Sequence, residues 1–334
     1  MDVAAFCRQS HVLVVVGKGG VGKTTVTAAL ALMAASRGLN VLVVALDDSG
    51  DLPALFGRDE PFGYEEVELA GPDATSRLRV PGQVRARVIT SDAALLEYLD
   101  DHGLRRVSRR LVDSGALDIV ATAIPGIEEV LVLGKVKQIE RAQAADVILL
   151  DAPATGHALT FLTSPGGLVD AARGGPLRQQ AEQVVELLSD PSRCQAIPVT
   201  LPEETPVNEL IETAFFLEDS TGVALGPVVV NGCYPNRGGL DADPAAAAAA
   251  AGASVPGAEL RRLGAAAAFR RARRAAQAEQ LDRLSSSLPL PQLRLPFLFS
   301  SEIGPNELGR LAEVLAAQVA SLPTASGAAT GVAP

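Results

Sequence analysis

The sequence of 334 residues contains no tryptophan, and aromatic residues make up only 4% of it. Hydrophobic residues nevertheless account for 48% of the chain, so a large core can be buried. That core is expected to consist mainly of valine, leucine, isoleucine and alanine, a composition that suits a parallel sheet flanked by helices.

Cysteine is also scarce, and Cys7, Cys194 and Cys233 lie far apart along the chain. They form no CxxC pair, and an odd number cannot be fully paired within one chain. This usage predicts a reduced, cytoplasmic setting.

Long apolar runs are missing as well. No stretch of about 18 apolar residues occurs, and the N-terminus lacks the charged segment, apolar segment and cleavage site of a signal peptide. The alanine-rich segment 245–253 comes closest, but Asp243, Pro244, Gly252 and Pro256 bracket it. A soluble protein with no integral membrane segment is therefore expected.

Basic residues are fewer than acidic residues, and the formal net charge is −10. No nucleic-acid partner is expected from this balance, although a local basic patch is compatible with it. Two arginine clusters, at 105–110 and 270–274, are read as solvated helix faces in preference to a partner or nucleic-acid surface.

The order of apolar segments predicts a P-loop NTPase fold, an α/β fold with a mostly parallel twisted sheet flanked by helices and a helical subdomain. Strands are expected at 12–16, 41–46, 146–150, 197–201, 228–230 and 293–297. Helices are expected at 21–36, 91–113, 127–144, 177–189, 205–220, 258–286 and 305–321. Loops are expected at 57–90 (with short strands), 164–176 and 236–257, the last of them mobile. We predict one domain, 1–322, with helical insertions at about 91–144, 163–195 and 236–287 and a disordered tail at 323–334.

Residues 17–25 read Gly-Lys-Gly-Gly-Val-Gly-Lys-Thr-Thr and lie between a predicted strand and a predicted helix. The glycines allow backbone N–H groups to turn inward onto phosphate oxygens, and the helix N-terminus attracts the same charge. Lys23 is expected to bridge the β- and γ-phosphates of ATP while Thr24 coordinates Mg²⁺. The predicted nucleotide-binding residues of this P-loop are Gly17, Lys18, Gly19, Gly20, Val21, Gly22, Lys23, Thr24 and Thr25.

Lys18 distinguishes this loop from an ordinary P-loop. The pattern Lys-Gly-Gly-x-Gly-Lys-Thr resembles the signature-lysine (deviant Walker A) group of ATPases. In that group two nucleotide sites face each other, and this lysine reaches the phosphates bound to the opposite subunit, as an arginine finger does. The resemblance implies catalytic roles for Lys18 and Lys23 and a dimeric protein; the simpler alternative for Lys18 is a solvated loop lysine.

Two aspartates follow predicted core strands. Asp47 comes after the strand at 41–46 and Asp151 after the strand at 146–150. Carboxylates at the C-terminal ends of parallel strands beside a P-loop face the nucleotide. One is expected to orient the attacking water and the other to hold Mg²⁺, directly or through water. Asp47 is the predicted catalytic residue, and the predicted metal-binding set is Thr24, Asp47 and Asp151.

The stretch 151–162, Asp-Ala-Pro-Ala-Thr-Gly-His-Ala-Leu-Thr-Phe-Leu, resembles the ArsA/GET family, which contains the arsenite-pump ATPase and the ATPase that targets tail-anchored membrane proteins. Segments 125–129, 200–209 and 228–231 are similar too, and the resemblance extends over about 10–320. It implies that Asp47 positions the water in switch I, that Asp151 begins switch II and that Asn231 reads the adenine. By the same resemblance Pro296 closes over the base, and His157 is either a switch II signal residue or a capping or packed histidine.

Several residues depart from the family pattern. Switch I reads Asp47-Asp48-Ser49-Gly50 where the family has Asp-Pro-Ala-His, so hydrolysis is expected to be slow or altered. Ala154 replaces a switch II proline. The CxxC that binds a dimer-bridging zinc is absent, so no zinc is expected, and no cysteine trio fits the arsenite site. With only two methionines, a methionine-rich groove for hydrophobic helices is unavailable.

These features together predict an ATP-binding and ATP-hydrolysing dimeric switch with ATP/ADP and Mg²⁺ as cofactors. It would act on an unknown protein client, as a homodimer or as a heterodimer with an ArsA-like paralogue, in the cytoplasm or at the membrane through a partner. Two alternatives stay open: a ParA/MinD-like positioning ATPase, and a weakly hydrolysing regulatory subunit paired with a catalytic paralogue. The alanine-, arginine- and glycine-rich composition is typical of a bacterial genome rich in G and C, such as an actinobacterial one.

Overall fold

The computed structural model describes residues 1–46, 51–73, 78–101, 103–114, 125–153 and 155–323. Its strands are β1 (Val12–Val16), β2 (Asn40–Ala45), β3 (Val67–Ala70), β4 (Gln83–Val88), β5 (Val147–Asp151), β6 (Cys194–Thr200), β7 (Ala224–Leu225), β8 (Val228–Cys233) and β9 (Gln292–Pro296). They form one sheet in the order β3-β4-β2-β5-β1-β6-β8-β9, and β7 pairs with β6. All pairs are parallel except β3 with β4. The predicted α/β fold is confirmed.

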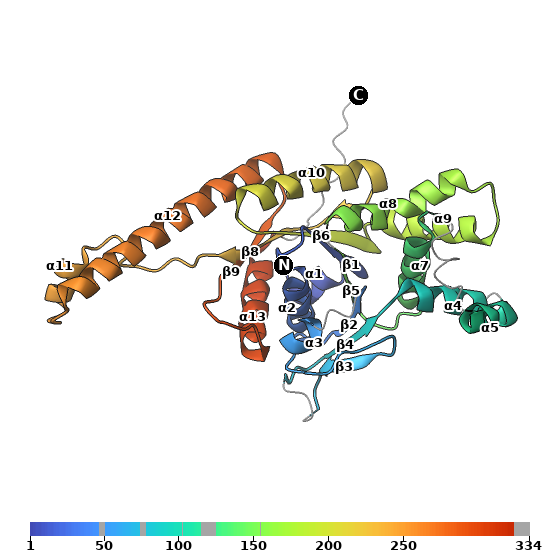
Figure 1. The fold of residues 1–334 in the computed structure, drawn as a ribbon, viewed down its shortest axis with the longest axis horizontal. Helices are drawn as coiled ribbons and strands as arrows, with labels where there is room; N and C mark the ends of the chain where they lie inside the picture. Colours follow the sequence, from blue (N-terminus) through green and yellow to red (C-terminus); the bar gives the residue numbers. More distant parts are fainter. Residues whose placement is uncertain (47–50, 74–77, 102, 115–124, 154, 324–334) are drawn as a thin grey trace.

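Helices cover both faces of this sheet (Figure 1). The helices are α1 (Val3–Cys7), α2 (Lys23–Ala35), α3 (Asp51–Leu55), α4 (Ser91–Asp101), α5 (Arg105–Ser114), α7 (Ile127–Arg141), α8 (Thr155–Ala171), α9 (Pro176–Ser189), α10 (Glu204–Thr221), α11 (Pro244–Ala250), α12 (Gly257–Ser287) and α13 (Pro305–Ser321). One core packs α1, α2 and α13 against the sheet, and a second core packs α4, α7, α8 and α9 against the other face.

Strand β1 lies at the centre of the sheet, between β5 and β6. All five of its residues are buried, and they alternate between the two cores: Leu13 and Val15 face α2, whereas Val12, Val14 and Val16 face the other layer. A strand covered on both faces needs an unbroken apolar run, which is what this sequence has. The loop after β1 is thereby fixed at the C-terminal edge of the sheet.

The short strands expected within residues 57–90 are present as β3 and β4, and β4 is paired along its six residues with β2. The expectation of one helix over 91–113 was wrong. The helix expected over 91–113 is two helices, α4 and α5, separated around Gly103, whose φ of +75° favours glycine and interrupts a right-handed helix.

Two further segments are more helical than predicted. α8 continues through Pro165 to Ala171, where a loop was expected, and the Thr163 and Ser164 hydroxyls donate hydrogen bonds to Leu159 and Thr160 carbonyls of the preceding turn. Within 236–257, Pro244–Ala250 forms a helix because the Asp243 side chain caps it, proline occupies its first turn and alanine has the highest helix propensity.

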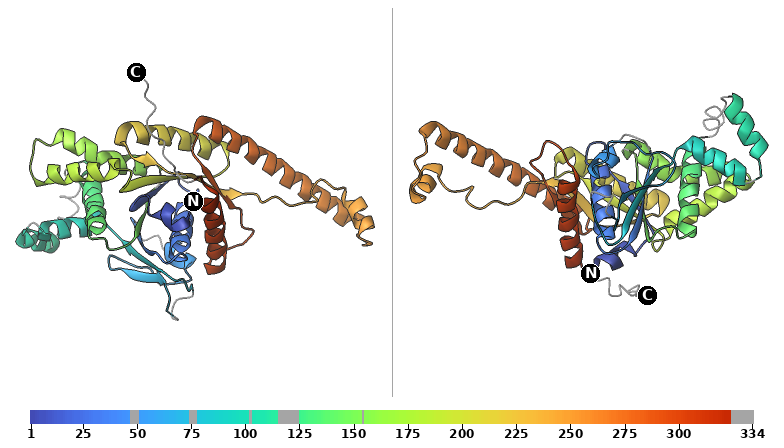
Figure 2. Two further views of the ribbon diagram at one scale, coloured as in Figure 1. Left: turned by 180° about the vertical axis from the view of Figure 1, so that it is seen from behind. Right: turned by 90° about the horizontal axis from the view of Figure 1, so that it is seen from below.

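α12 projects away from the body of the protein and carries α11 near its outer end (Figure 2). We call the loop after β8, α11 and residues 257–274 of α12 the arm. No helix in the described part of the chain is long and apolar enough to cross a membrane. Of the tail predicted at 323–334, residues 324–334 lie outside the described residues.

Candidate nucleotide site

The loop between β1 and α2 has the backbone of a phosphate cradle. Gly20 and Gly22 have φ values of +83° and +87°, and Gly22 caps the N-terminus of α2. A Cβ atom at Gly17 would lie 2.3 Å from the Val199 carbonyl oxygen, and one at Gly22 would lie 2.4 Å from the Asn231 side-chain nitrogen. Glycine is therefore required at these positions by the surrounding structure, independently of any ligand. The result is a turn that aims backbone N–H groups and the N-terminus of α2 at one point.

Asp151, the last residue of β5, is held at the first turn of α2. The Thr24 hydroxyl donates a hydrogen bond of 2.7 Å to one carboxylate oxygen of Asp151, and the Thr27 hydroxyl donates one of 3.2 Å to the other. Thr24 and Asp151, predicted separately from the P-loop and from strand position, are thus brought together. Thr27 was missed, although it follows Thr24 by three residues and so shares its face of the helix.

The two P-loop lysines have different surroundings. The Lys23 ammonium donates to the Lys18 carbonyl oxygen at 3.4 Å, so it lies over the loop where a phosphate chain would pass. The Lys18 ammonium forms an ion pair of 2.5 Å with Glu209 of α10 in the same chain. Both side chains of this pair are more than one-third exposed, so the pair adds little stability by itself.

Asn231 of β8 lies directly beside the P-loop, where its side-chain nitrogen donates to the Val21 carbonyl oxygen at 2.9 Å. Pro296, the last residue of β9, is placed one strand further out and is paired with Cys233. The structure therefore places Asn231 beside the P-loop, and neither Asn231 nor Pro296 is among the residues that line the adjoining cavity.

That cavity, of about 670 Å³, opens beside the P-loop and is of the size that holds small-molecule ligands. Its first wall is Gly20, Gly22, Thr24 and Thr25; the second is Asp51, Ala54, Leu55, Gly57 and Asp59; the third is Glu302, Ile303, Gly304 and Pro305. The second and third walls were missed, because nothing in the sequence of α3 or of the segment before α13 marks them as neighbours of the P-loop.

Several predicted residues lie outside the described part of the chain. These are Asp47, Asp48, Ser49 and Gly50 of switch I and Ala154 of switch II. His157 belongs to α8, but its side chain is likewise outside the described set. Their predicted roles stay predictions.

The whole chain resembles proteins named as ATPases. It is 34% identical over 323 residues to ATPase BagA of Mycobacterium tuberculosis, an alignment that covers 91% of this chain and 92% of that protein. The sequence model of the anion-transporting ATPase (ArsA ATPase) family matches residues 10–171. The chain belongs to the ArsA ATPase family.

The relatives of this ArsA-family protein include members of both groups that the sequence resemblance indicated, the GET ATPases and the arsenical pump ATPases. ATPase get3 of Schizosaccharomyces japonicus is 32% identical over 172 residues, which cover 49% of this chain and 49% of that protein. The arsenical pump-driving ATPase of Escherichia coli is 28% identical over 238 residues, 66% of this chain and 39% of that protein. The predicted family is confirmed, and the mycobacterial relative agrees with the actinobacterial composition.

The oxygen atoms at the head of α2 suit Mg²⁺. This ion takes hard oxygen ligands, one or two carboxylates, waters and substrate phosphates, and rarely an all-protein cage. Thr24 and Asp151 supply a hydroxyl and a carboxylate already in contact. Within the described ranges, no three His, Cys, Asp or Glu side chains are grouped to hold a metal ion, so nucleotide phosphates and water would complete the shell.

The cysteines of this family member lie on different elements: Cys7 on α1, Cys194 on β6, and Cys233 on β8, two residues after Asn231. Cys7 and Cys194 are buried, Cys233 is half-buried, and all three thiols are free. Burial raises the pKa of Cys194 to about 12 and that of Cys233 to about 11, so both are held as neutral thiols. Thiolates are the metal-binding and nucleophilic form, so burial disfavours that chemistry at both residues.

Proposed function

We propose that this ArsA-family chain is an ATP-binding and ATP-hydrolysing switch. The observation that carries the proposal is the contact of 2.7 Å between the Thr24 hydroxyl and the Asp151 carboxylate, directly below the glycine loop and Lys23. A hydroxyl, a carboxylate and an ammonium converge there on a helix N-terminus, which is the set of groups that holds a magnesium–triphosphate unit.

Each group has a distinct part in this proposal. Loop N–H groups and Lys23 bind and orient the β- and γ-phosphates. Thr24 and Asp151 would hold Mg²⁺, directly or through water, and the ion would neutralise negative charge that develops on the transferred phosphoryl group. Asp47 orients the attacking water. The ribose lies in the 670 Å³ cavity, where Asp51, Asp59 and Glu302 offer acceptors to its hydroxyls, and Asn231, whose side chain lies next to Gly22 of the cavity wall, reads the adenine.

Lys18 is proposed to act on the nucleotide of a second subunit, which is either another copy or an ArsA-like paralogue. The Lys18–Glu209 ion pair belongs to the separate chain, and loss of this pair accompanies association. ATP then favours the closed pair of subunits, and hydrolysis releases it. Such a cycle couples nucleotide state to a client protein, and we place it in the cytoplasm with any membrane contact made through a partner.

The decisive experiment compares two lysine variants of the P-loop. Lys23→Ala is expected to abolish nucleotide binding, measured with a fluorescent ATP analogue, because its ammonium contacts phosphate in the same chain. Lys18→Ala is expected to keep this binding and lose turnover, because its partner phosphate belongs to the other subunit. Unchanged ATP affinity in Lys23→Ala would refute the site.

A second candidate function is a nucleotide-binding subunit that hydrolyses ATP weakly and regulates a catalytic paralogue. The extra carboxylate of Asp48 beside Asp47 supports it, since a second negative charge near the γ-phosphate opposes attack. Steady-state phosphate release separates the two functions. Turnover by the chain alone favours the first, and turnover only after a paralogue is added favours the second.

A further inference from the structure

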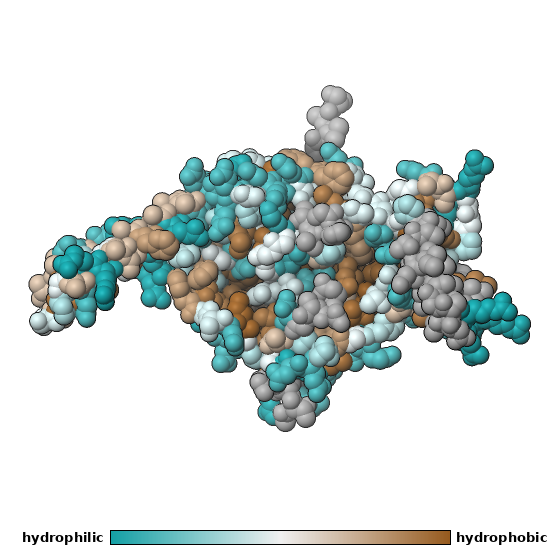
Figure 3. Space-filling model, viewed as in Figure 1, coloured by the Kyte–Doolittle hydropathy of each residue, from teal (hydrophilic) through white to brown (hydrophobic). Residues whose placement is uncertain are grey.

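The arm is held weakly to its own chain. The buried residues of α12 are Gln277, Leu281 and Leu284, all in its C-terminal third, whereas Leu263 and Phe269 further out are 55% and 62% exposed. In the space-filling view the arm bears mostly hydrophilic and weakly hydrophobic side chains, and strongly hydrophobic surface gathers on the body beside it (Figure 3). Most of the stability of helices in proteins comes from packing against other elements, so the outer half of α12 gains stability from whatever covers it.

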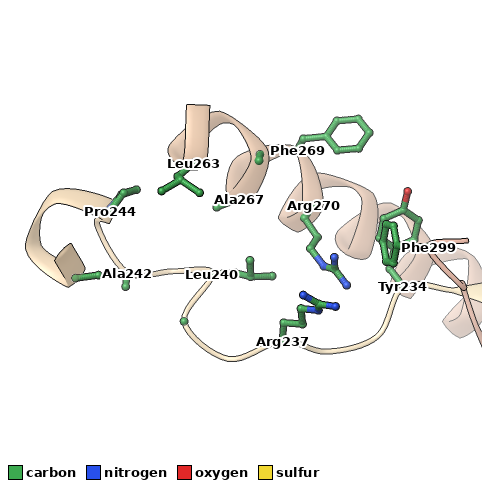
Figure 4. Close-up of a pocket in the computed structure, with 13 residues that line it drawn as sticks. Tyr234, Arg237, Leu240, Ala242, Pro244, Leu263, Ala267, Phe269, Arg270 and Phe299 are labelled. Carbon is green, nitrogen blue, oxygen red and sulfur yellow. The ribbon is translucent and has the colours of Figure 1, made fainter. Parts of the chain in front are cut away.

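A pocket of about 480 Å³ lies between α12 and the loop that follows β8 (Figure 4). Its floor on α12 repeats at helical spacing: Leu263, then Ala266 and Ala267, then Arg270. Alanines between two larger residues leave a hollow in the helix surface, the shape into which a side chain of another helix packs. The hollow is mainly apolar, and it is open to solvent.

Two guanidinium groups point toward one another in this pocket, those of Arg237 and Arg270 (Figure 4). The ion pairs of the arm are made by Arg271 with Asp241 and by Arg273 with Glu203, and neither pocket arginine pairs with a carboxylate of the described residues. The Arg270 side chain lies over the Phe299 ring, and its Nε is buried without a hydrogen-bond partner. Like charges that face each other in an apolar hollow favour an occupant that brings negative charge.

The outer part of α12 is basic, whereas α10 is acidic. Residues 257–274 hold six arginines and one glutamate, in a chain whose net charge is −10. α10 contains five acidic residues and no basic one. Its outer face carries Glu212, Phe215, Phe216 and Asp219 at helical spacing, and the two phenylalanines are 50% and 44% exposed. Adjacent exposed phenylalanines flanked by carboxylates match an apolar hollow flanked by arginines.

We infer that the arm pocket receives the Phe215–Phe216 stripe of α10 from a second copy of this chain. The phenylalanine rings fill the hollow over Ala266 and Ala267, and Glu212 and Asp219 come to Arg237 and Arg270. Each copy carries both surfaces, and in a closed pair of chains the contact is made twice about a two-fold axis. This inference rests on the proposed dimeric switch and extends it, since it gives the homodimer a contact apart from the nucleotides.

The first test is a mixed cross-link between two variants that each carry one added cysteine, with the wild-type chain as the control for disulfides formed by its native cysteines. Phe215→Cys chains and Ala267→Cys chains are combined and oxidised. A disulfide needs Cα atoms within about 7 Å, so cross-linked dimers are expected in this mixture. The matched control is Phe215→Cys with Ala265→Cys, a neighbouring exposed position on α12 that does not line the pocket. Equal cross-linking in both mixtures would overturn the inference.

The second test measures self-association by sedimentation equilibrium with ADP present. The double variant Phe215→Ser/Phe216→Ser is expected to weaken association at least tenfold, and Leu104→Ser, another exposed hydrophobic position, is expected to leave it unchanged. Charge reversal adds a rescue: Arg237→Glu/Arg270→Glu chains should pair with Glu212→Arg/Asp219→Arg chains better than either pairs with wild type. Unchanged association in the serine variant, or assemblies larger than two chains, would contradict the reciprocal contact.

Nucleotide binding is measured on the same samples, so that two failures can be told apart. If the cross-link fails while Lys23→Ala still loses ATP, the arm contact is wrong and the proposed switch stands. If Lys23→Ala keeps ATP, the proposed switch is wrong whatever the arm does.

Discussion

The helices α2 and α12 are stabilised by different interactions. Ten of the thirteen residues of α2 are buried between the sheet and α13, whereas three of the thirty-one residues of α12 are buried. α2 is therefore held by the core of its own chain, which fixes the head of the helix where phosphate would bind. α12 depends on the helix propensity of alanine, arginine and leucine and on contacts near its base. A site built on α2 is rigid within one chain, and a surface built on α12 is available to another.

The largest effect should come from the chemistry fixed by α2. Asp151→Asn keeps a hydrogen-bond acceptor for Thr24 but removes the charge that supports a metal ion, so turnover is expected to fall about 10²- to 10³-fold. Phosphate release under saturating Mg-ATP measures it. Asp146→Asn is the control, because this aspartate accepts from the Asn40 backbone at the opposite end of β5. Equal losses in both variants would mean that folding, and not the metal site, was disturbed.

A second comparison concerns packing. Leu30 of α2 is 2% exposed, and Leu30→Ala should lower the free energy of unfolding by about 2–5 kcal/mol through the lost contacts and the cavity. Leu263→Ala on α12, with 55% exposure, should change it by less than about 0.5 kcal/mol. Urea unfolding at low protein concentration measures both. Similar losses would show that the arm is packed in the single chain after all.

A smaller effect is expected where α7 packs on α9, a region with a buried charge. Lys137 is 4% exposed and donates hydrogen bonds to the Gln180 and Gln183 side-chain oxygens at 3.1 and 2.6 Å. Burial, reinforced by the charges of Arg141 and Arg193, lowers the pKa of Lys137 to about 8. Between about pH 8 and the ordinary lysine value of 10.5, the unfolded chain binds more protons than the folded one, so this residue makes stability rise with pH.

The Lys137→Met variant should lack that rise. The difference in unfolding free energy between wild type and variant is expected to change by about 1–2 kcal/mol from pH 7.5 to pH 10, in favour of the wild type. Denaturant melts at several pH values measure it. The difference is the informative quantity, because the cysteines and tyrosines titrate in both proteins. A constant difference would show that Lys137 keeps an ordinary pKa.

The sequence predicts the parts of this fold whose signals are local. The run of valines in β1, the glycine loop and the apolar start of α2 each follow from a few adjacent residues, as does Asp151 at the end of a strand. β4 is harder, since Arg85 and Arg87 alternate with apolar residues as in an exposed strand. Arg85 instead reaches the Glu66 side chain and the Ala144 carbonyl oxygen, so this face is covered. Such pairing depends on residues distant in sequence.

The candidate site likewise contains residues that the local sequence predicts and contacts that it does not predict. Thr24 and Lys23 are readable from the motif, and Asn231 from the family resemblance. The contact of Lys18 with Glu209 spans 191 positions, and the cavity walls at Asp51 and Ile303 come from elements at opposite ends of the chain. Their local sequences do not indicate these contacts, because the order of strands in the sheet brings the elements together. Tertiary packing supplies that information.

The Lys18–Glu209 ion pair has a thermodynamic consequence. In the proposed dimer, one ammonium cannot satisfy both the Glu209 carboxylate and a phosphate of the facing subunit, so the two would compete for the same group. By linkage, competition is reciprocal: a ligand of α10 that strengthens this ion pair would weaken subunit association, and association would weaken binding of that ligand by the same factor. The acidic helix would therefore be a place where an event far from the phosphates sets the strength of the association that ATP favours.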